Sequence, residues 1–438
     1  MYDIIYIGGG LNYAGAIVAA KHGLKVALVE TSLDQLGGAC LHKGCIPSKM
    51  FLHHANIIRQ SKESVFTGEI TLDMQLLTAK KNKLIHSATK AVTAQCAQLE
   101  LIEGKGQVIA PHKVQVEGKV YEAEYIVIGT GSSPFIPEGI TYDGKAIITS
   151  NEVLELQKLP KEIAIYGDGA IGLEMACFFA SSGVKVTLLS RGERLLGKSH
   201  PLIQSAIVKE MERLGVTHLK NHAVTNAEQT DKGVHIAFED GTSGDYEQML
   251  VATGRLPNTD VIATDEIVVN SGIETDDWYE TSLSKHYAVG DCNGKVKLAH
   301  AARAQALNVT MQILGKKPEK LNLDHVVQFI HTLPMSYATV GENRYSLEKN
   351  DSVFNESVVK LNHFTGSAFH HASKGSMIVY ADEEGLILGA EILAPEAEEL
   401  IAPVAMALAG EMTASSAQKT IMAHPTFSEA LERAYFRL

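Results

Sequence analysis

The pattern of apolar and polar positions predicts a chain that alternates short buried strands with helices. Predicted strands at residues 4–7 and 25–30, the second apolar at 26–29, flank a glycine turn and a stretch with helical spacing. Residues 163–166 and 185–190 repeat this arrangement around a second glycine turn. Strands that are buried on both faces read as unbroken apolar runs, and their alternation with helices is typical of α/β folds with parallel sheets.

Both glycine turns have the form that binds dinucleotides. The first reads Gly8-Gly9-Gly10-Leu11-Asn12-Tyr13, and the second reads Gly167-Asp168-Gly169-Ala170-Ile171-Gly172. In such a turn one glycine permits the tight bend, one lets the backbone approach a pyrophosphate, and one allows close packing of helix on strand. The N–H groups at the start of the helix then hold the phosphates. Two such units indicate two separate domains, one for each dinucleotide.

The first turn is irregular. Tyr13 stands where the third glycine belongs, and Gly15 follows two residues later. We therefore expect the phosphate turn to be kept but the packing of its helix to be altered. Glu30 ends the second strand, where a carboxylate can accept hydrogen bonds from a ribose. The alternative for Glu30 is a solvated charge at a strand end.

Three further apolar runs lead into glycine turns, at residues 126–132, 250–255 and 287–291. Asp291 closes the last of them and could bind a ribityl or ribose hydroxyl. The alternative is an ordinary Gly-Asp turn that ends a strand.

The last part of the chain has another character. Apolar strands at residues 376–380 and 386–392 precede an alanine-rich helical stretch at residues 396–409. Pro395 suits the start of that stretch and Gly410 its end. No nucleotide motif is present, so we interpret this part as an α+β domain suited to dimerisation.

Composition narrows the class of protein. The 438 residues are 45% apolar and 21% charged, as in an ordinary soluble protein of several domains. The net charge of −12 argues against nucleic acid or an anionic membrane as a partner. No apolar stretch reaches the ~20 residues that span a bilayer, and the chain enters a strand with no signal-like segment. We expect a cytoplasmic protein.

Candidate redox chemistry lies in the run Gly37-Gly38-Ala39-Cys40-Leu41-His42-Lys43-Gly44-Cys45-Ile46-Pro47-Ser48-Lys49. Cys40 and Cys45 form a possible two-electron dithiol/disulfide couple beside a nucleotide cofactor. A disulfide in a cytosolic protein is usually catalytic or redox-sensing. A helix that begins after Cys45 would favour its thiolate.

Other uses of cysteine are less favoured. The chain has five cysteines, too few for a disulfide scaffold. A metal site would need the nearby histidines 42, 53 and 54, but the spacing is not the usual zinc pattern and no second ligand pair follows, so we expect no metal. We expect Cys96, Cys177 and Cys292 to be buried small apolar residues.

The chain closes with His424-Pro425-Thr426-Phe427-Ser428-Glu429. A histidine five residues before a glutamate could form a general base whose tautomer the carboxylate fixes. A dithiol needs such a base, because only the thiolate reacts. A surface contact is the alternative for an isolated His–Glu pair.

Taken together, these motifs resemble the class I pyridine nucleotide-disulfide oxidoreductases over essentially the whole chain. This family includes dihydrolipoamide dehydrogenase, glutathione reductase, mycothione reductase and mercuric reductase. The resemblance implies an α/β fold with two Rossmann-like domains and a C-terminal α+β dimerisation domain. The implied segments are 1–148 (FAD-binding), 149–264 (NAD(P)-binding), 265–322 (returning to the FAD domain) and 323–438 (dimerisation).

The resemblance also implies roles for single residues. Cys45 would face the flavin and Cys40 would meet the substrate, while His424, held by Glu429, would come from the other subunit of a homodimer. Lys49 and Glu174 look like the pair beside flavin and nicotinamide. The implied FAD-binding residues are Gly8, Gly10, Glu30, Lys49, Gly106, Thr130, Gly131, Ser132, Asp291, Leu298, Ala299 and His300. The implied nicotinamide-nucleotide residues are Gly167, Gly169, Gly172, Ser190, Arg191 and Gly254.

The motifs look most like dihydrolipoamide dehydrogenase, with two departures. The acidic residue that ends the second strand of NAD-binding units is replaced by Ser190, followed by Arg191 and Arg194. A carboxylate would repel a 2′-phosphate whereas arginine binds one, so we expect NADP(H) to be favoured over NAD(H). The segment 332–337 also lacks the glutamate that usually follows its proline. Mercuric reductase fits less well, because no C-terminal cysteine pair is present.

We therefore expect a homodimeric, FAD-dependent disulfide/dithiol oxidoreductase that acts on lipoamide or a lipoyl domain. The alternative is an NADPH-dependent reductase of another low-molecular-weight disulfide or oxidant. A third hypothesis is a redox-responsive binding protein without turnover, but such a protein would have no use for the base His424.

Overall fold

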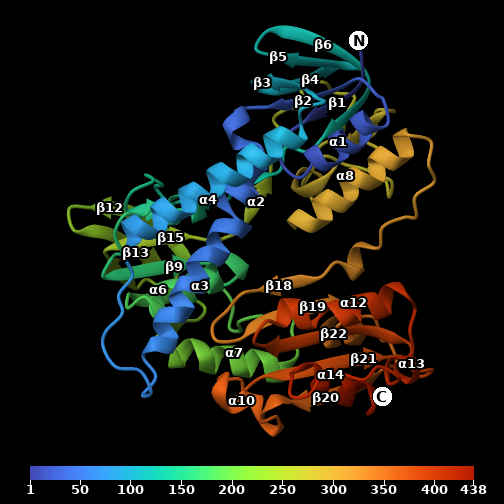
Figure 1. The fold of residues 1–438 in the computed structure, drawn as a ribbon. Helices are drawn as coiled ribbons and strands as arrows, with labels where there is room; N and C mark the ends of the chain where they lie inside the picture. Colours follow the sequence, from blue (N-terminus) through green and yellow to red (C-terminus); the bar gives the residue numbers. More distant parts are fainter. The chain divides into compact units, whose positions relative to one another are not determined.

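The structure is a computed structural model that describes residues 1–438. The chain divides into two compact units, and each combines segments that are distant in the sequence. Unit 1 contains Met1–Met50, Gln75–Phe135 and Gly254–Leu323, and unit 2 contains Phe51–Met74, Ile136–Thr253 and Asp324–Leu438. Figure 1 labels the elements and colours them along the sequence. The chain thus leaves unit 1 and returns to it twice before it ends in unit 2.

Unit 1 is built on a seven-stranded sheet whose central strands are parallel. Its order is β3-β2-β1-β6-β5-β4, and β17 also pairs with β6. A two-stranded ribbon of β7 and β16 lies apart from this sheet. The strands are β1 (Tyr2–Ile7), β2 (Val26–Glu30), β3 (Glu100–Glu103), β4 (Gly106–Ala110), β5 (Lys113–Val116), β6 (Lys119–Ile128), β7 (Ser132–Pro134), β16 (Arg255–Pro257) and β17 (His286–Ala288).

Both faces of this sheet are buried, as the unbroken apolar runs predict. Ile4 and Tyr6 pack into one core cluster, whereas Ile5 and Ile7 from the same strand pack into another. The helices of the unit are α1 (Tyr13–Lys21), α2 (Gly38–Lys43), most of α4 (Met74–Gln95) and α8 (Ala299–Ile313), with short helical turns η1 (Leu33–Gln35), η2 (Gly290–Asn293) and η3 (Leu323–His325), the last at its boundary. The helix α3 (Cys45–Ser61) starts in unit 1 and ends in unit 2.

The altered packing that we expected for α1 is found at Gly15. A Cβ atom at Gly15 would lie 2.5 Å from Oγ1 of Thr310 and 2.8 Å from the carbonyl oxygen of Ala306, both in α8. Gly15 therefore lets α1 approach α8 closely, whereas the third glycine of the usual turn serves contact with the strand.

The second glycine turn belongs to a five-stranded parallel sheet in unit 2, with the order β11-β10-β9-β15-β8. An antiparallel sheet of β12, β13 and β14 is inserted in sequence between β11 and β15. The strands are β8 (Ile147–Ile148), β9 (Glu162–Tyr166), β10 (Lys185–Leu189), β11 (Thr217–Leu219), β12 (Val224–Thr230), β13 (Gly233–Phe238), β14 (Ser243–Tyr246) and β15 (Gln248–Val251). The helices are α5 (Ser150–Val153), α6 (Ala170–Ser181) and α7 (Pro201–Arg213).

The C-terminal part of unit 2 is an antiparallel sheet with the order β18-β19-β22-β21-β20. Its strands are β18 (Gln328–Ile330), β19 (Ser336–Gly341), β20 (Asn355–Lys360), β21 (Ser376–Ala381) and β22 (Ile387–Ala394). The helical elements are α9 (Arg344–Lys349), η4 (Leu361–His363), α10 (Gly366–Phe369), α11 (Ala397–Leu400), α12 (Ala402–Ala409), α13 (Ala414–Ala417) and α14 (Ser428–Tyr435). The mixed α/β class, with a separate α+β part at the C-terminus, is confirmed.

One predicted element is wrong in detail. The alanine-rich stretch 396–409 forms two short helices, α11 and α12, instead of one. Pro403 lies in the first turn of α12 and has no N–H to donate to a preceding turn, so a continuous helix would lack a hydrogen bond there. Gly410 follows the last residue of α12 as predicted.

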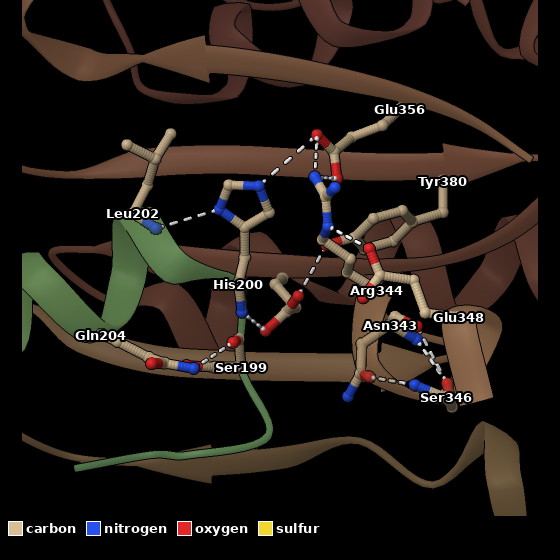
Figure 2. Close-up of polar contacts among 11 residues, drawn as sticks. Ser199, His200, Leu202, Gln204, Asn343, Arg344, Ser346, Glu348, Glu356 and Tyr380 are labelled. Carbon is tan, nitrogen blue, oxygen red and sulfur yellow. Dashed lines mark hydrogen bonds and ion pairs between the residues drawn. The ribbon is translucent and has the colours of Figure 1, made fainter. Parts of the chain in front are cut away.

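A buried polar network joins the start of α7 to the C-terminal sheet (Figure 2). His200 donates its backbone N–H to Glu391 over 2.9 Å, and its Nε2 atom lies 3.4 Å from Oε1 of Glu356. Glu391 also accepts hydrogen bonds from the hydroxyls of Tyr337 (2.9 Å) and Tyr380 (2.7 Å). Because each of these groups is satisfied by a partner on another element, the network fixes α7 on the sheet within unit 2.

Candidate active site

The first glycine turn joins β1 to α1 as a phosphate-binding loop requires. Gly8 has a φ of 98°, and a Cβ atom there would lie 2.3 Å from the carbonyl oxygen of Gly129. Only glycine suits this position. Glu30 accepts a 2.6 Å hydrogen bond from the N–H of Gly9 and a 2.7 Å bond from that of Thr31. Its carboxylate is therefore held beside the turn, where a ribose hydroxyl could also reach it.

The residues around this turn fit a dinucleotide such as FAD. The side chain of Asn12 is buried and donates weakly to the carbonyl oxygens of Ile7 and Val127, while its Oδ1 atom has no partner. A Cβ atom on Gly38 would lie 2.6 Å from Cα of Gly10. The run that carries the cysteine pair thus begins in close contact with the turn that would hold the pyrophosphate.

Cys40 and Cys45 lie on either side of the junction between α2 and α3. Cys45 is the first residue of α3, so its thiol stands at the N-terminus of a 17-residue helix, as predicted. A Cβ atom on Gly44 would lie 2.8 Å from the carbonyl oxygen of Ala39, which explains the glycine between the two helices. The structure holds both cysteines as thiols, with Cys40 half-buried and Cys45 exposed.

The two thiols influence each other electrostatically. The pKa of Cys40 is raised, first by the side-chain hydrogen bond to Cys45 and then by burial, while the charge of Lys49 acts in the opposite direction. Cys40 is therefore protonated at neutral pH and needs a base before it can attack a disulfide. His42 lies between the two cysteines in sequence, and its Nε2 atom is 3.0 Å from the carbonyl oxygen of Leu36.

Arg255 is a charged residue of this region that the sequence did not single out for a role. It donates from Nε to Oγ of Ser132 over 2.8 Å and from a terminal nitrogen to the carbonyl oxygen of Ser132. Ser132 in turn donates to Oδ2 of Asp291 over 2.5 Å. Burial lowers the pKa of Arg255, whereas the charges of Asp291 and Cys45 raise it. The partly buried guanidinium of Arg255 thus lies within electrostatic range of Cys45. Its contact with Ser132 depends on the pairing of β7 with β16, which the sequence did not reveal.

The other predicted FAD residues lie at the ends of neighbouring elements of unit 1. Thr130 exchanges two hydrogen bonds with Asn258, of 2.7 and 2.9 Å, in the turn after β6. The remaining positions are Gly131 after β6, Asp291 in η2, Leu298 as the N-cap of α8, Ala299 and His300 in its first turn, and Gly106 at the start of β4. Their roles stay predictions.

The second glycine turn is regular. Gly167 has a φ of 119°, and a Cβ atom on it would lie 2.3 Å from the carbonyl oxygen of Ala252. A Cβ atom on Gly172 would lie 1.8 Å from the carbonyl oxygen of Gly167, so the third glycine is required here. No atom lies within 4 Å of the corresponding position on Gly169, the N-cap of α6. The open middle position and the two closed ones fit a bound nucleotide pyrophosphate.

The end of β10, where the acidic residue is missing, carries a polar cluster. Oγ of Ser190 donates to the carbonyl oxygen of Gly192 over 2.9 Å and lies 2.8 Å from Nε2 of His218. Arg191 donates from Nε to the hydroxyl of Tyr166 over 2.9 Å. Burial, and then the charge of Lys220, lower the pKa of His218. His218 was not expected from the sequence, because it lies on β11 and reaches Ser190 only through the pairing of strands.

The remaining candidates lie in unit 2, except Gly254, the first residue of the last segment of unit 1. Glu174 is buried on α6 and accepts a 3.0 Å hydrogen bond from the N–H of His331. His424 and Glu429 form the predicted pair, with Nδ1 and Oε1 2.6 Å apart. The side-chain hydrogen bond to His424 lowers the pKa of Glu429. The imidazole of His424 is 80% exposed, so its Nε2 edge is accessible to a substrate or a second chain. Gly254 has a φ of 123° between β15 and β16.

Comparison with protein families accounts for this arrangement. Residues 2–306 match the model of the family described as pyridine nucleotide-disulphide oxidoreductase. The chain belongs to this family. Residues 327–435 match the dimerisation domain of the same family. The protein is accordingly a flavoprotein oxidoreductase, and the cofactors of its family are FAD and a pyridine nucleotide.

Relatives of known name span the whole chain. A dihydrolipoyl dehydrogenase of Bacillus subtilis is 30% identical over 99% of this chain and 97% of its own length. Dihydrolipoyl dehydrogenase 2 of Haloarcula marismortui is 32% identical over 99% of this chain and 95% of its own length. The resemblance to the lipoamide dehydrogenase branch is thus supported along its full length.

Solved structures with the same fold include LpdA of Mycobacterium tuberculosis, with a TM-score of 0.92 and 23% identity over 100% of this chain and 99% of that chain. The HOCl-induced flavoprotein disulfide reductase RclA of Escherichia coli has a TM-score of 0.90 and 24% identity over 99% of each chain. Within the structure itself, no helix combines the length and apolar character that a membrane span needs.

Proposed function

We propose that this oxidoreductase passes electrons between a nicotinamide nucleotide and a small disulfide through the Cys40–Cys45 couple, with lipoamide or a lipoyl domain as the leading substrate. The observation that carries the proposal is the junction of α2 and α3, where the thiol of Cys40 interacts with that of Cys45 and Cys45 opens α3. The relatives named dihydrolipoyl dehydrogenase support lipoamide as the substrate.

Unit 1 would hold FAD through Gly8, Gly10, Glu30 and Asp291. When bound, FAD supplies two-electron transfer between the nicotinamide and the dithiol. Cys45 would be the thiol on the flavin side, and Cys40 would be the thiol that meets the substrate. Lys49 and Glu174 would flank the cofactors.

In the direction of disulfide reduction, His424 takes the proton of Cys40, and the resulting thiolate attacks one substrate sulfur. The substrate S–S bond breaks, a mixed disulfide forms, and the leaving thiolate takes a proton from His424. The thiolate of Cys45 then attacks Sγ of Cys40, which closes the Cys40–Cys45 disulfide and releases the second substrate sulfur as a thiolate, which takes a proton from solvent. Two electrons leave the protein dithiol and two reach the substrate.

We infer that the active enzyme is a homodimer and that His424 serves the dithiol of the other subunit. The exposed imidazole and the match of residues 327–435 to a dimerisation domain support this inference. Glu429 fixes Nδ1 of His424, which leaves Nε2 for proton transfer.

We further propose that NADP(H) is favoured over NAD(H). No carboxylate lies at the end of β10, because Ser190 occupies that position. The side chain of Arg191 is held by the hydroxyl of Tyr166, at the end of β9. Arg191 after β10 and Lys220 after β11 would supply positive charge toward a 2′-phosphate. The hydroxyl of Ser190 already contacts Gly192 and His218. Of Ser190 and Arg191, Arg191 is therefore the stronger candidate to bind the 2′-phosphate.

An alternative function is the NADPH-dependent reduction of another low-molecular-weight disulfide or of an oxidant. The missing acidic residue at Ser190 favours this alternative. The fold is also shared with a reductase named for its induction by HOCl, although the likeness to that protein extends to the fold alone.

The test is an assay of the purified holoprotein. We expect a yellow protein with one FAD per chain that oxidises dihydrolipoamide or reduces lipoamide with a nicotinamide nucleotide. Parallel assays with glutathione disulfide and with Hg(II), each with NADH and NADPH, separate the two functions. A colourless protein that gains no activity with FAD would contradict both.

A further inference from the structure

We propose that His331 and Glu398 form a positioning pair that holds Glu174 in place for electron transfer from the nicotinamide nucleotide. The proposal rests on the function above, in which Glu174 lies beside the nicotinamide. His331 acts through its backbone on Glu174, and Glu398 acts through the imidazole of His331.

The first contact lies between the β18–β19 connection and helix α6. The backbone N–H of His331 donates to Oε1 of Glu174 over 3.0 Å, and that of Leu333 donates to Sγ of Cys177 over 3.4 Å. Glu174 and Cys177 are three residues apart and therefore lie on one face of α6. Two alternate N–H groups of the connection thus bind two neighbouring side chains of the helix.

The connection itself is firmly packed. Thr332, Leu333 and Met335 are each 1% exposed. The hydroxyl of Thr332 donates to the carbonyl oxygen of Met335 over 2.5 Å, which closes the bend between β18 and β19. Met335 follows Pro334, at the position where related sequences usually have a glutamate, and it is part of this packing. The donor to Glu174 therefore comes from a segment with little freedom, except at its edge, where His331 is only partly buried.

The imidazole of His331 contacts a further element, the helix α11. Its Nδ1 atom lies 3.0 Å from Oε1 of Glu398 in α11, and the two side chains are mostly buried. Burial opposes ionisation of Glu398, but the contact with His331, its own backbone and Ser336 together lower its pKa. Glu398 is therefore a carboxylate at neutral pH, with His331 as its histidine partner.

The charge arrangement explains why the pair matters. Glu174 and Glu398 are two partly or fully buried carboxylates, and a buried carboxylate depends on donors and cations at fixed positions. Without Glu398, the imidazole of His331 loses the contact that fixes it. The backbone N–H that donates to Glu174 then belongs to a residue that is free to shift. A shift of about 1 Å in a positioned group costs up to about 100-fold in rate.

The experiment compares His331→Leu, Glu398→Gln and the rescue variant His331→Asn, whose amide can replace Nδ1–H toward Glu398. The matched control is His235→Leu, which removes a histidine from an exposed ion pair with Asp245 of 2.8 Å. Anaerobic stopped-flow measurement gives the rate constant of flavin reduction by the favoured nicotinamide nucleotide and the apparent Kd of that nucleotide. A second mixing experiment gives the rate of reoxidation by the disulfide substrate.

We expect His331→Leu and Glu398→Gln to slow flavin reduction at least about tenfold, with the nucleotide Kd within about twofold and reoxidation unchanged. The double variant should be no slower than either single one, and His331→Asn should regain most of the rate. Equal losses in both half-reactions, or a full rate in Glu398→Gln, would overturn the proposal.

A second measurement needs no turnover. Amide hydrogen exchange resolved at His331 should be slow in the wild type and at least about tenfold faster in Glu398→Gln, while the N–H of Leu333 is unchanged. Unchanged exchange at His331 would also overturn the proposal. A wild type that no nicotinamide nucleotide reduces would instead contradict the proposed function, and the role of Glu174 with it.

Discussion

At the scale of single residues, Cys40 and Cys45 are chemically distinct although they are close neighbours. Cys40 lies in α2, and its pKa is raised by the hydrogen bond to Cys45 and by burial. Cys45 opens α3, where the helix N-terminus favours negative charge. The other three cysteines are fully buried, and burial raises the pKa of Cys177 to about 12 and those of Cys96 and Cys292 to about 11. Only the Cys40–Cys45 pair is suited to exchange.

If Cys45 is the thiolate on the flavin side, the reduced enzyme should show a long-wavelength charge-transfer absorbance band. The band should survive Cys40→Ser, because the flavin-side thiolate remains, and should vanish in Cys45→Ser. Reductive titration followed by visible absorbance measures this. Loss of the band in the Cys40 variant alone would reverse the assignment of the two thiols.

His424 should matter for the thiol exchange and not for flavin reduction. His424→Gln should slow turnover of the disulfide substrate at least ~100-fold, the usual scale for the loss of a general acid–base group. Flavin reduction by the nicotinamide nucleotide should keep its rate, as stopped-flow absorbance would show. His363→Gln, at another exposed histidine of the C-terminal part, is the control.

At the scale of elements, strand ends determine the chemistry. Parallel strands bring their carboxyl ends to one edge of a sheet, so β9, β10 and β11 place Tyr166, Arg191, Ser190 and His218 together. The ends of β6 and β17 likewise bring Ser132 and Asp291 together in unit 1. Ligands bind at such edges in open α/β sheets.

Arg191→Glu tests the preference for NADP(H). Charge-assisted contacts with a 2′-phosphate contribute about 1.5–3 kcal/mol, so the wild type should favour NADPH more than about tenfold in kcat/KM. A carboxylate at this position repels the phosphate, and the variant should lose or reverse the preference. Steady-state kinetics with both nucleotides measure the ratio, and Lys232→Glu, at an exposed lysine between β12 and β13, is the matched control for added charge. A wild type that prefers NADH would contradict the prediction and strengthen the dihydrolipoamide dehydrogenase assignment.

The network between α7 and the C-terminal sheet should stabilise unit 2 in a pH-dependent way. Burial raises the pKa of Glu391, and the donors Tyr380, His200 and Tyr337 oppose this rise. A raised pKa means that folding favours the protonated form, so Glu391 destabilises the fold as pH rises through and beyond the usual carboxyl range. Tyr380→Phe removes a donor to this carboxylate and should cost about 1.5–3 kcal/mol at pH 8.

The loss in Tyr380→Phe should be smaller near pH 5, because more of Glu391 is then protonated in the folded state. Urea denaturation at both pH values measures the difference. Tyr345→Phe, at a half-exposed tyrosine, is the control and should change the free energy of unfolding little. A cost that is larger at pH 5 than at pH 8 would contradict the sign of the effect.

At the scale of the whole molecule, the chain assembles its proposed cofactor sites from separated segments. Unit 1 takes the first nucleotide fingerprint from the N-terminus and Asp291 from much later in the sequence, and unit 2 joins the second fingerprint to the C-terminal sheet. His424, the proposed base, lies in unit 2, and Cys40 and Cys45 lie in unit 1. A homodimer would supply each dithiol with a base from the other chain.

Hybrid dimers test this arrangement. Cys40→Ser and His424→Gln homodimers should each be nearly inactive with the disulfide substrate. Co-expression of both chains should restore activity to about one quarter of the wild type, because half of randomly paired dimers are hybrids and each hybrid has one intact site. Tagged purification of the hybrid and a steady-state assay measure this. An inactive hybrid would indicate that each chain supplies its own base.

The sequence by itself determined the α/β class, both phosphate turns, the cysteine pair and the closing His–Glu pair. These features depend on residues close together in the chain: period and turn chemistry fix strands and glycines, and Cys45 opens its helix because the helical stretch begins there. The altered packing of α1 was also foreseen from Tyr13 and Gly15, although its partner was not.

Only the tertiary structure decided contacts between segments that are distant in sequence. Arg255 reached Ser132 through the pairing of β7 with β16, and His218 reached Ser190 through that of β10 with β11. The contact of His331 with Glu174 joins residues 157 positions apart. No local pattern encodes such contacts, because they follow from which strands pair and which side chains the core brings together.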